Sequence, residues 1–139
     1  MNRKLECALE YIKMGWRILP LYGIADGKCG CGKPDCSSPG KHPALRNGSK
    51  NASNDEQQVR KWFDGNHNYN IGICAGAESG LVILDVDPAH GGDDSLKKYK
   101  VPETLEVMTG SGGRHFYFAH PGGDIRNSAG KLGPGLDVR

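Results

Sequence analysis

The chain has 139 residues, a length that suits one domain with a modest single core, so two independent domains are not expected. Eighteen lysines and arginines against 16 aspartates and glutamates give a formal net charge of +2, which does not by itself point to nucleic acid. Charged residues, among them Glu6 and Glu10, interrupt the apolar pattern of the N-terminus, which excludes a secretory signal, and no apolar run has membrane-spanning length. We therefore expect a cytoplasmic protein with five reduced cysteines, where clustered cysteines favour a metal over disulfides.

The predicted elements begin with an amphipathic helix. Leu5, Leu9, Ile12 and Trp16 recur at helical spacing, and Gly15 is a plausible helix end. The segments that follow are a strand (16–22), a loop (23–51), a helix opened by a capping box at Ser53 and Glu56, two strands (70–76, 81–87), a short helix (93–100), a hairpin (104–110 with 115–120) and a strand (135–139). These elements predict an α+β fold whose apolar strands stack under the N-terminal helices.

An apolar strand at 81–84 runs directly into two aspartates, Asp85 and Asp87. Side chains alternate along a strand, so both carboxylates project to one face while Val86 points to the other. Like charges this close are costly unless a cation lies between them, and Mg²⁺ or Mn²⁺ is the usual solution. The alternative is a solvated strand end before Pro88. The motif alone is short, so its meaning depends on the rest of the chain.

A second group of polar and small residues lies in the segment "TGSGGRHFYF". The small residues at 111–113 allow backbone amides to approach an anion closely, and Arg114 and His115 place donors beside them. This pattern predicts a cradle for a polyphosphate, and the alternative is a glycine-rich hairpin turn with an incidental histidine. Asp137 in "GLDVR" would add a third carboxylate on another strand end.

Together these motifs carry a family resemblance. The order Asp85-x-Asp87, Ser111-x-x-x-His115 and Leu-Asp137-Val resembles the three motifs of archaeo-eukaryotic primases, and most of all the bifunctional DNA primase/polymerase (prim-pol) N-terminal domain of plasmid, phage and integrated-element replication proteins. The segments "GWRILPLY", "GKHPAL", "NIGICAG" and "AGKLGPGLDVR" extend the resemblance over nearly the whole chain. It implies one domain over residues 1–139 with a primase-like (RRM-like) mixed or antiparallel sheet and N-terminal helices. Family members continue past the third motif, so we expect the chain to be truncated at its C-terminus.

The resemblance implies a nucleotidyltransferase that acts as a DNA primase and DNA-directed polymerase. Two divalent ions, Mg²⁺ or Mn²⁺, would be held by Asp85, Asp87 and Asp137. The incoming triphosphate would be contacted by Ser111, Arg114 and His115. The implied partners are nucleoside or deoxynucleoside triphosphates, a single-stranded DNA template with its primer and, in a full-length protein, a helicase domain; no membrane is involved. Weaker candidates for phosphate contacts are Lys97, Lys98, Arg126 and Lys131.

The loop at 23–51 contains a second set of metal-ligand residues. The set is Cys29, Cys31, Cys36 and His42, spaced Cys-x-Cys-x4-Cys-x5-His. Thiolate and imidazole ligands suit tetrahedral Zn²⁺, which predicts a structural zinc site, whereas free surface thiols are the alternative. Cys7 and Cys74 are expected to take no part.

Two other enzyme classes and one binding function compete with the primase interpretation. A metal-dependent nucleotide-sugar glycosyltransferase also uses Asp-x-Asp, but it is expected to be longer and has no evident use for "SGGRH". A haloacid dehalogenase-type phosphatase requires its aspartates on an early parallel strand, whereas here a hairpin follows. The third alternative is a non-catalytic, zinc-stabilised nucleic-acid-binding module, but its three uncompensated carboxylates would repel the phosphates of a nucleic acid.

Overall fold

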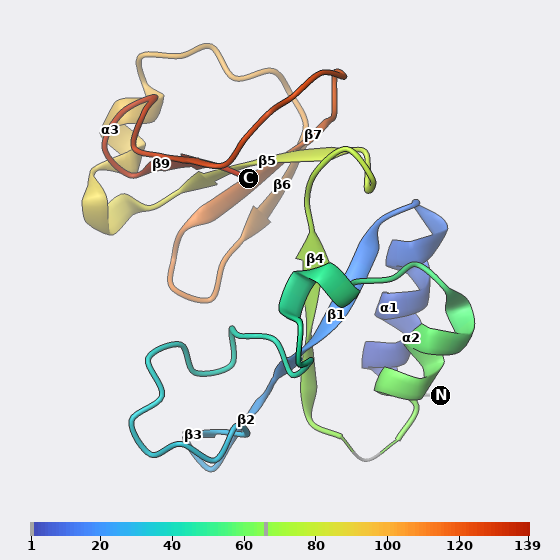
Figure 1. Cartoon of the computed structure of the whole chain (residues 1–139). Helices are drawn as coiled ribbons and strands as arrows, with labels where there is room; N and C mark the ends of the chain where they lie inside the picture. Colours follow the sequence, from blue (N-terminus) through green and yellow to red (C-terminus); the bar gives the residue numbers. More distant parts are fainter. Residues whose placement is uncertain (1, 66) are drawn as a thin grey trace. The chain divides into compact units, whose positions relative to one another are not determined.

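The computed structural model describes residues 2–65 and 67–139 (Figure 1). The chain forms two compact units, Met1–Cys74 and Ala75–Arg139. Each unit combines short helices with antiparallel strands, which confirms the α+β class. Within the described part of the chain, no helix is both long enough and apolar enough to cross a membrane.

In the first unit, two helices lie side by side on one side of a two-stranded ribbon (Figure 1). The helices are α1 (Arg3–Lys13) and α2 (Glu56–Phe63), and the strands are β1 (Arg17–Tyr22) and β4 (Tyr69–Cys74), which pair antiparallel over their whole length. Apolar residues at helical spacing face the ribbon and pack against Ile18 of β1. They are Leu5, Ala8, Leu9, Val59 and Phe63, which form a buried core with Ile18. The helices therefore cover this ribbon.

The helix α2 begins differently from its prediction. The capping box at Ser53 and Glu56 is wrong, because Asp55 caps the helix and its carboxylate accepts a hydrogen bond of 3.0 Å from Gln58 N. Ser53 is held elsewhere: its backbone exchanges two hydrogen bonds of 2.9 Å with Ile18 of β1. A residue bonded to a strand in this way is not available to cap the helix.

The predicted loop at 23–51 is not wholly irregular. It contains three short elements: β2 (Ile24–Ala25), β3 (Lys28–Cys29) and the 3₁₀ helix η1 (Gly48–Asn51). Asp26 and Gly27 join β2 to β3 with φ values of 52° and 73°, the left-handed pair typical of a two-residue hairpin turn. The remainder of the segment forms no helix or strand, and the loop extends from the ribbon away from the two helices (Figure 1).

The second unit is built on a five-stranded antiparallel sheet in the order β6-β7-β5-β9-β8. Its elements are β5 (Leu81–Val86), η2 (Pro88–His90), α3 (Gly92–Leu96), β6 (Leu105–Met108), β7 (Arg114–Ala119), β8 (Ser128–Ala129) and β9 (Leu136–Val138). The helix expected at 93–100 ends at Leu96, and β8 was not predicted. Val86, Phe116 and Leu136 form a core on one face, with Leu96 packed against it, so the sheet has a core of its own.

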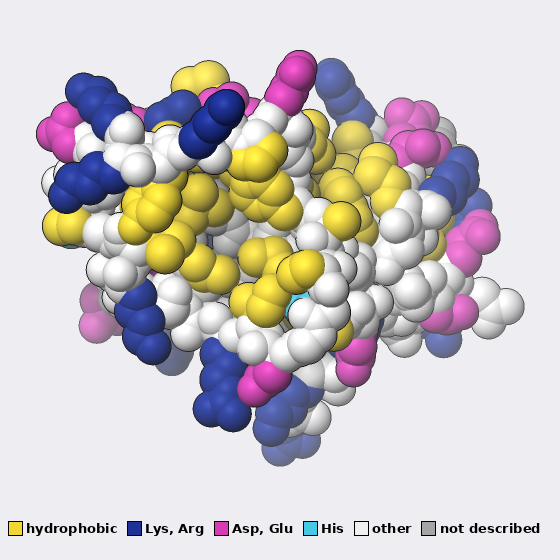
Figure 2. Space-filling model, turned by 90° about the horizontal axis from the view of Figure 1, so that it is seen from above, with side chains coloured by type: hydrophobic (Ala, Val, Ile, Leu, Met, Phe, Trp, Pro, Cys, Tyr) yellow, Lys and Arg dark blue, Asp and Glu magenta, His cyan; other side chains and the backbone are white. Residues whose placement is uncertain are grey.

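Several apolar side chains of the second unit remain exposed. They are Tyr99, Leu105, Val107, Met108, Ile125 and Leu132. Figure 2 shows apolar side chains gathered on one face of the molecule, with lysines and arginines at the margin. Every residue of β6 is exposed, so this strand forms an open edge of the sheet.

Candidate active site and metal-binding loop

Three strands place an ionisable side chain at the same level of the five-stranded sheet. Asp85 on β5 lies directly opposite both His115 on β7 and Asp137 on β9. The backbones of Ile83 and Arg139 exchange hydrogen bonds of 3.0 and 2.9 Å. Because every second residue of an antiparallel strand bonds to the same neighbour, the backbone N–H and C=O of Asp85 also point toward β9 and away from β7. Asp85 therefore meets His115 at a non-hydrogen-bonded position, where facing side chains come closest, and His115 Nε2 lies 3.4 Å from Asp85 Oδ1.

Two carboxylates in this row face each other across the strands. Like charges directly opposite destabilise a sheet, and each of these carboxylates has a basic side chain beside it. His115 lies against Asp85, and a guanidinium nitrogen of Arg139 lies 3.4 Å from Asp137 Oδ2. Both carboxylate side chains remain 31% exposed, so a ligand in solution can reach them.

The backbone of Asp87, just beyond the end of β5, is clamped between two glycines. Its N–H donates to Gly135 O at 2.8 Å, and its carbonyl accepts from Gly92 N at 2.8 Å. A Cβ atom built on either glycine would lie 2.6 Å from the Asp87 carbonyl oxygen, and one on Gly135 would lie 2.4 Å from Gly92 N. No side chain fits at these positions without moving Asp87, which explains Gly92 in "HGGD" and Gly135 in "GPGL".

The carboxylate of Asp87 is oriented by the turn that follows it. Oδ1 accepts from Ala89 N at 2.9 Å, and Oδ2 lies 2.6 Å from His90 Nδ1. The hydrogen bond from His90 is the main cause that lowers the pKa of Asp87 below its ordinary value. Asp87 is therefore held as an anion.

The turn between β6 and β7 is closed by Thr109. Its Oγ1 accepts from Gly113 N at 2.9 Å and lies 3.5 Å from Ser111 Oγ, while its carbonyl accepts from Gly112 N at 3.1 Å. A Cβ on Gly113 would lie 2.7 Å from Val86 O, so the turn packs against the end of β5. The amides of Gly112 and Gly113, expected to face an anion, are thus bonded within the turn, and Ser111 is left exposed at its tip.

Arg114 lies on the opposite face of the sheet from His115, because neighbouring residues of a strand point to opposite faces. Its guanidinium bonds to Asp93 at 2.8 Å and to Glu106 at 3.3 Å, and it lies 5.3 Å from the ring centroid of Phe116. These carboxylates raise the pKa of Arg114 further above its ordinary value. Arg114 ties β7 to β6 and to the start of α3.

The four predicted zinc ligands come together in the first unit. The ligand atoms of Cys29, Cys31, Cys36 and His42 all lie within 4.8 Å of one another, and His42 Nε2 is 3.5 Å from the sulfurs of both Cys29 and Cys36. Zinc bonds of about 2.3 Å to sulfur and about 2.0 Å to nitrogen place these atoms about 3.5 Å apart in a tetrahedron. The group could hold zinc, as predicted, and Cys7 and Cys74 lie outside it.

The surrounding backbone stabilises the thiolate of one cysteine of this group and holds the loop in place. Amide hydrogen bonds from Cys31 and Gly40 lower the pKa of Cys29 to about 6, which favours the thiolate that binds zinc. The His42 ring lies against Tyr22 with centroids 4.9 Å apart, and its carbonyl accepts from Tyr22 N at 3.0 Å. These contacts connect the ligand loop to the end of β1.

Comparison with known proteins identifies the family. The model of the family described as bifunctional DNA primase/polymerase, N-terminal (Prim-Pol) matches residues 8–139. The chain belongs to this family. No curated protein and no solved structure matches it. The Prim-Pol match covers nearly the whole chain and includes both compact units, so the zinc-ligand loop and the carboxylate row belong to one family region.

The structure brings some predicted site residues of this Prim-Pol chain together and separates others. Asp85, His115 and Asp137 share one row, Asp87 follows beyond the end of β5, and Arg114 lies on the other face. Among the described residues, only the three cysteines and His42 form a group of three or more ligands at metal-binding distance, so the aspartates are not gathered as closely. The catalytic and nucleotide-binding roles stay predictions.

Sequence reasoning missed two residues that organise this candidate site. His90 orients Asp87, and Thr109 closes the turn that carries Ser111. The signal for His90 was the Asp-Pro-x-His segment, in which a proline opens a tight turn and returns the histidine to the aspartate. Thr109 carried no comparable signal, because its partner Gly113 is defined only once the turn has formed.

Proposed function

We propose that this Prim-Pol chain performs template-directed nucleotidyl transfer. The observation that carries the proposal is the row of Asp137, Asp85 and His115 on adjacent strands, with Asp87 clamped beside it, in a chain of this family. All strand pairs of the described sheets are antiparallel, which argues against the phosphatase alternative with its parallel strands.

The donor set suits hard divalent cations. Asp85, Asp87 and Asp137 supply only oxygen ligands, which Mg²⁺ and Mn²⁺ prefer, and all three carboxylates are partly exposed to solvent. Two such ions, when bound, stabilise the attacking and the leaving oxygen of an in-line displacement at phosphorus. The carboxylates would need to exchange their present partners, His115, His90 and Arg139, for the ions.

The chain's own residues then position the triphosphate. A primer 3′-hydroxyl attacks the α-phosphorus of the incoming nucleotide, and pyrophosphate leaves. His115, next to Asp85, would donate a hydrogen bond to a phosphate oxygen, where it opposes the charge that develops on the leaving group. Ser111, at the exposed tip of the turn beside the end of β5, would donate a second one.

The wider setting is proposed from the family alone. It comprises replication of a plasmid, phage or mobile element, nucleoside or deoxynucleoside triphosphates as substrates, and a single-stranded DNA template. A helicase domain in the same protein and a cytoplasmic location also stay predictions.

The test removes two carboxylates that the proposal requires. The double variant Asp85→Asn and Asp87→Asn should lose Mg²⁺- or Mn²⁺-dependent extension of a labelled primer, and it should bind Mn²⁺ more weakly by electron paramagnetic resonance. The matched control is Asp94→Asn with Asp124→Asn, which removes the same charge from two exposed ion pairs of the same unit. Equal extension by the parent and the Asp85 and Asp87 variant, or no nucleotide incorporation by the parent, would contradict the proposal.

A further inference from the structure

Charge is distributed unevenly between the two units. Residues 1–74 hold eleven lysines and arginines against seven aspartates and glutamates, whereas residues 75–139 hold seven against nine. The near-neutral total of the chain therefore conceals a basic first unit and an acidic second one. A basic surface is where a polyanion binds, and the acidic unit is the one that holds the candidate ligands for divalent cations.

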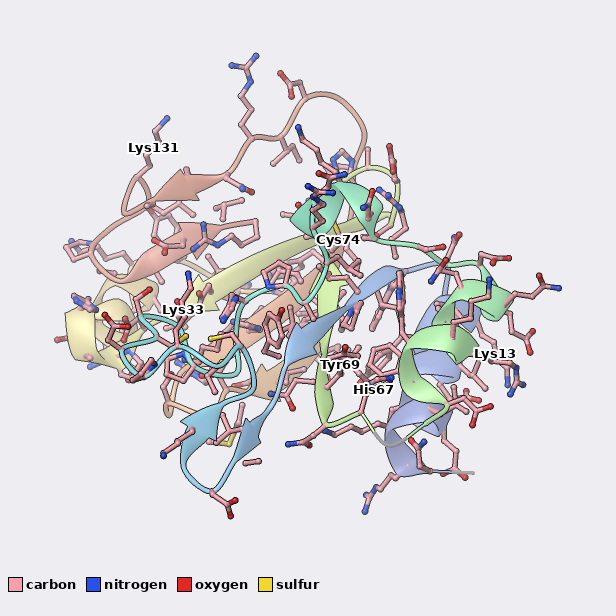
Figure 3. The ribbon with its side chains drawn as sticks, turned by 60° about the horizontal axis from the view of Figure 1, so that its bottom comes forward. Lys13, Lys33, His67, Tyr69, Cys74 and Lys131 are labelled. Atoms are coloured by element: carbon pink, nitrogen blue, oxygen red, sulfur yellow. The ribbon has the colours of Figure 1, made fainter. Side chains whose placement is uncertain are left out.

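Most of the basic excess lies on one segment, the zinc loop, which we define as residues 23–51. Its five basic residues are Lys28, Lys33, Lys41, Arg46 and Lys50, against the two acidic residues Asp26 and Asp35. All five basic side chains are exposed, and within the described residues none makes an ion pair or a side-chain hydrogen bond. Lys33 is labelled on this loop in Figure 3.

The cations elsewhere in the chain are more often paired. Lys13 and Arg60 bind neighbouring glutamates on their own helices. Of the four weaker candidates for phosphate contacts, Lys97 pairs with Asp94 and Arg126 pairs with Asp124, whereas Lys98 and Lys131 make no ion pair within the described residues. A phosphate would have to displace these carboxylates, whereas the zinc loop offers its cations without such competition.

We propose that the zinc loop binds the phosphate backbone of single-stranded DNA through these five basic side chains. The inference rests on the proposed function, because a template-directed enzyme must hold a single-stranded template. A zinc ion with three thiolates and a neutral imidazole carries a single negative charge, so the loop stays cationic when the metal is bound. The metal would fix the spacing of the basic residues while they contact the DNA.

The composition of the loop also indicates how the DNA is recognised. Residues 23–51 contain no phenylalanine, tyrosine or tryptophan, so the loop offers none of the large aromatic rings on which bases stack. Binding by the loop should therefore depend on phosphate charge, be strongly reduced by salt and show little preference for sequence.

The test compares two triple variants that remove the same charge from different places. Lys33→Gln, Lys41→Gln and Arg46→Gln change the zinc loop. Arg3→Gln, Lys61→Gln and Lys100→Gln are the control, because these side chains are also exposed and make no ion pair within the described residues. Binding of a labelled oligo(dT) is measured by fluorescence anisotropy over a range of salt concentrations, and the zinc content of each protein is checked.

Each phosphate contact to a single strand contributes about 0.7 to the slope of log K against log salt concentration, so the zinc-loop triple should reduce the slope by about 2. The control triple should leave the slope nearly unchanged, and both should keep their zinc. Equal slopes for the two triples would overturn the inference, as would equally salt-sensitive binding of a double-stranded oligonucleotide, which would assign the loop to duplex DNA. Extension of a labelled primer at saturating template is a separate readout: if the parent protein fails to extend it while the slopes differ as expected, the proposed function fails and the DNA contact stands.

Discussion

The clamp on Asp87 makes a quantitative prediction for Gly135→Ala. Gly135 has a φ of 76°, a region where a residue with a Cβ costs about 1–2 kcal/mol relative to glycine. The added methyl would also lie 2.4 Å from Gly92 N and 2.6 Å from the Asp87 carbonyl oxygen, and overpacking of this kind costs about 1–3 kcal/mol. The free energy of unfolding should therefore fall by about 2–5 kcal/mol in total.

The matched control is Gly122→Ala. Gly122 has a φ of 93°, but nothing lies within 4 Å of a Cβ built there, so only the conformational cost of about 1–2 kcal/mol applies. Urea unfolding followed by far-ultraviolet circular dichroism measures both variants, and hydrogen exchange of the Asp87 amide, which donates to Gly135, reports on the clamp itself. Equal losses of stability in the two variants, with unchanged exchange at Asp87, would refute the steric argument.

Two further predictions concern the candidate ligand groups. His115→Ala should raise the KM for nucleoside triphosphate and lower kcat by about 100-fold or more, because the hydrogen bond from His115 to the phosphate strengthens as pyrophosphate leaves. In the same steady-state assays the control His120→Ala should match the parent. Identical kinetic constants for the two variants would remove His115 from the site. The protein purified without chelator should contain one zinc per chain, which Cys31→Ser should lose and Cys7→Ser should keep. Metal analysis that finds no zinc in the parent would show that these cysteines are ordinary thiols.

The regular elements were predictable where the hydrophobic pattern was strong. The N-terminal helix, the strand at 81–86 and the hairpin at 105–119 all follow from apolar periodicity and glycine-rich turns. The prediction failed where a tertiary contact decided the outcome. Ser53 reads as a helix cap in isolation, but its pairing with Ile18 of β1 removes it from that position.

One element that was missed did carry a sequence signal. Asp26 and Gly27 form the dipeptide most typical of a two-residue hairpin turn, and they lie between the residues that became β2 and β3. The absence of apolar periodicity predicts a loop for this segment. Strands of two residues are too short to show an apolar period, so turn chemistry is the better test for such a hairpin.

The candidate active site was only partly predictable, because its composition depends on the register of three strands that are distant in sequence. The spacing within "LDVD" shows that Asp85 and Asp87 share a face, but not which residues of β7 and β9 lie beside them. Since side chains alternate with a period of two, a slip of one residue on β7 would place Arg114 next to Asp85 and send His115 to the opposite face. The observed register is fixed by the core on that opposite face, where Val86, Phe116 and Leu136 must all be buried together. The apolar residues between the motif positions therefore determine which polar residues form the site. This explains why Ser111, Arg114 and His115, which are neighbours in the sequence, lie in different places once the sheet is formed.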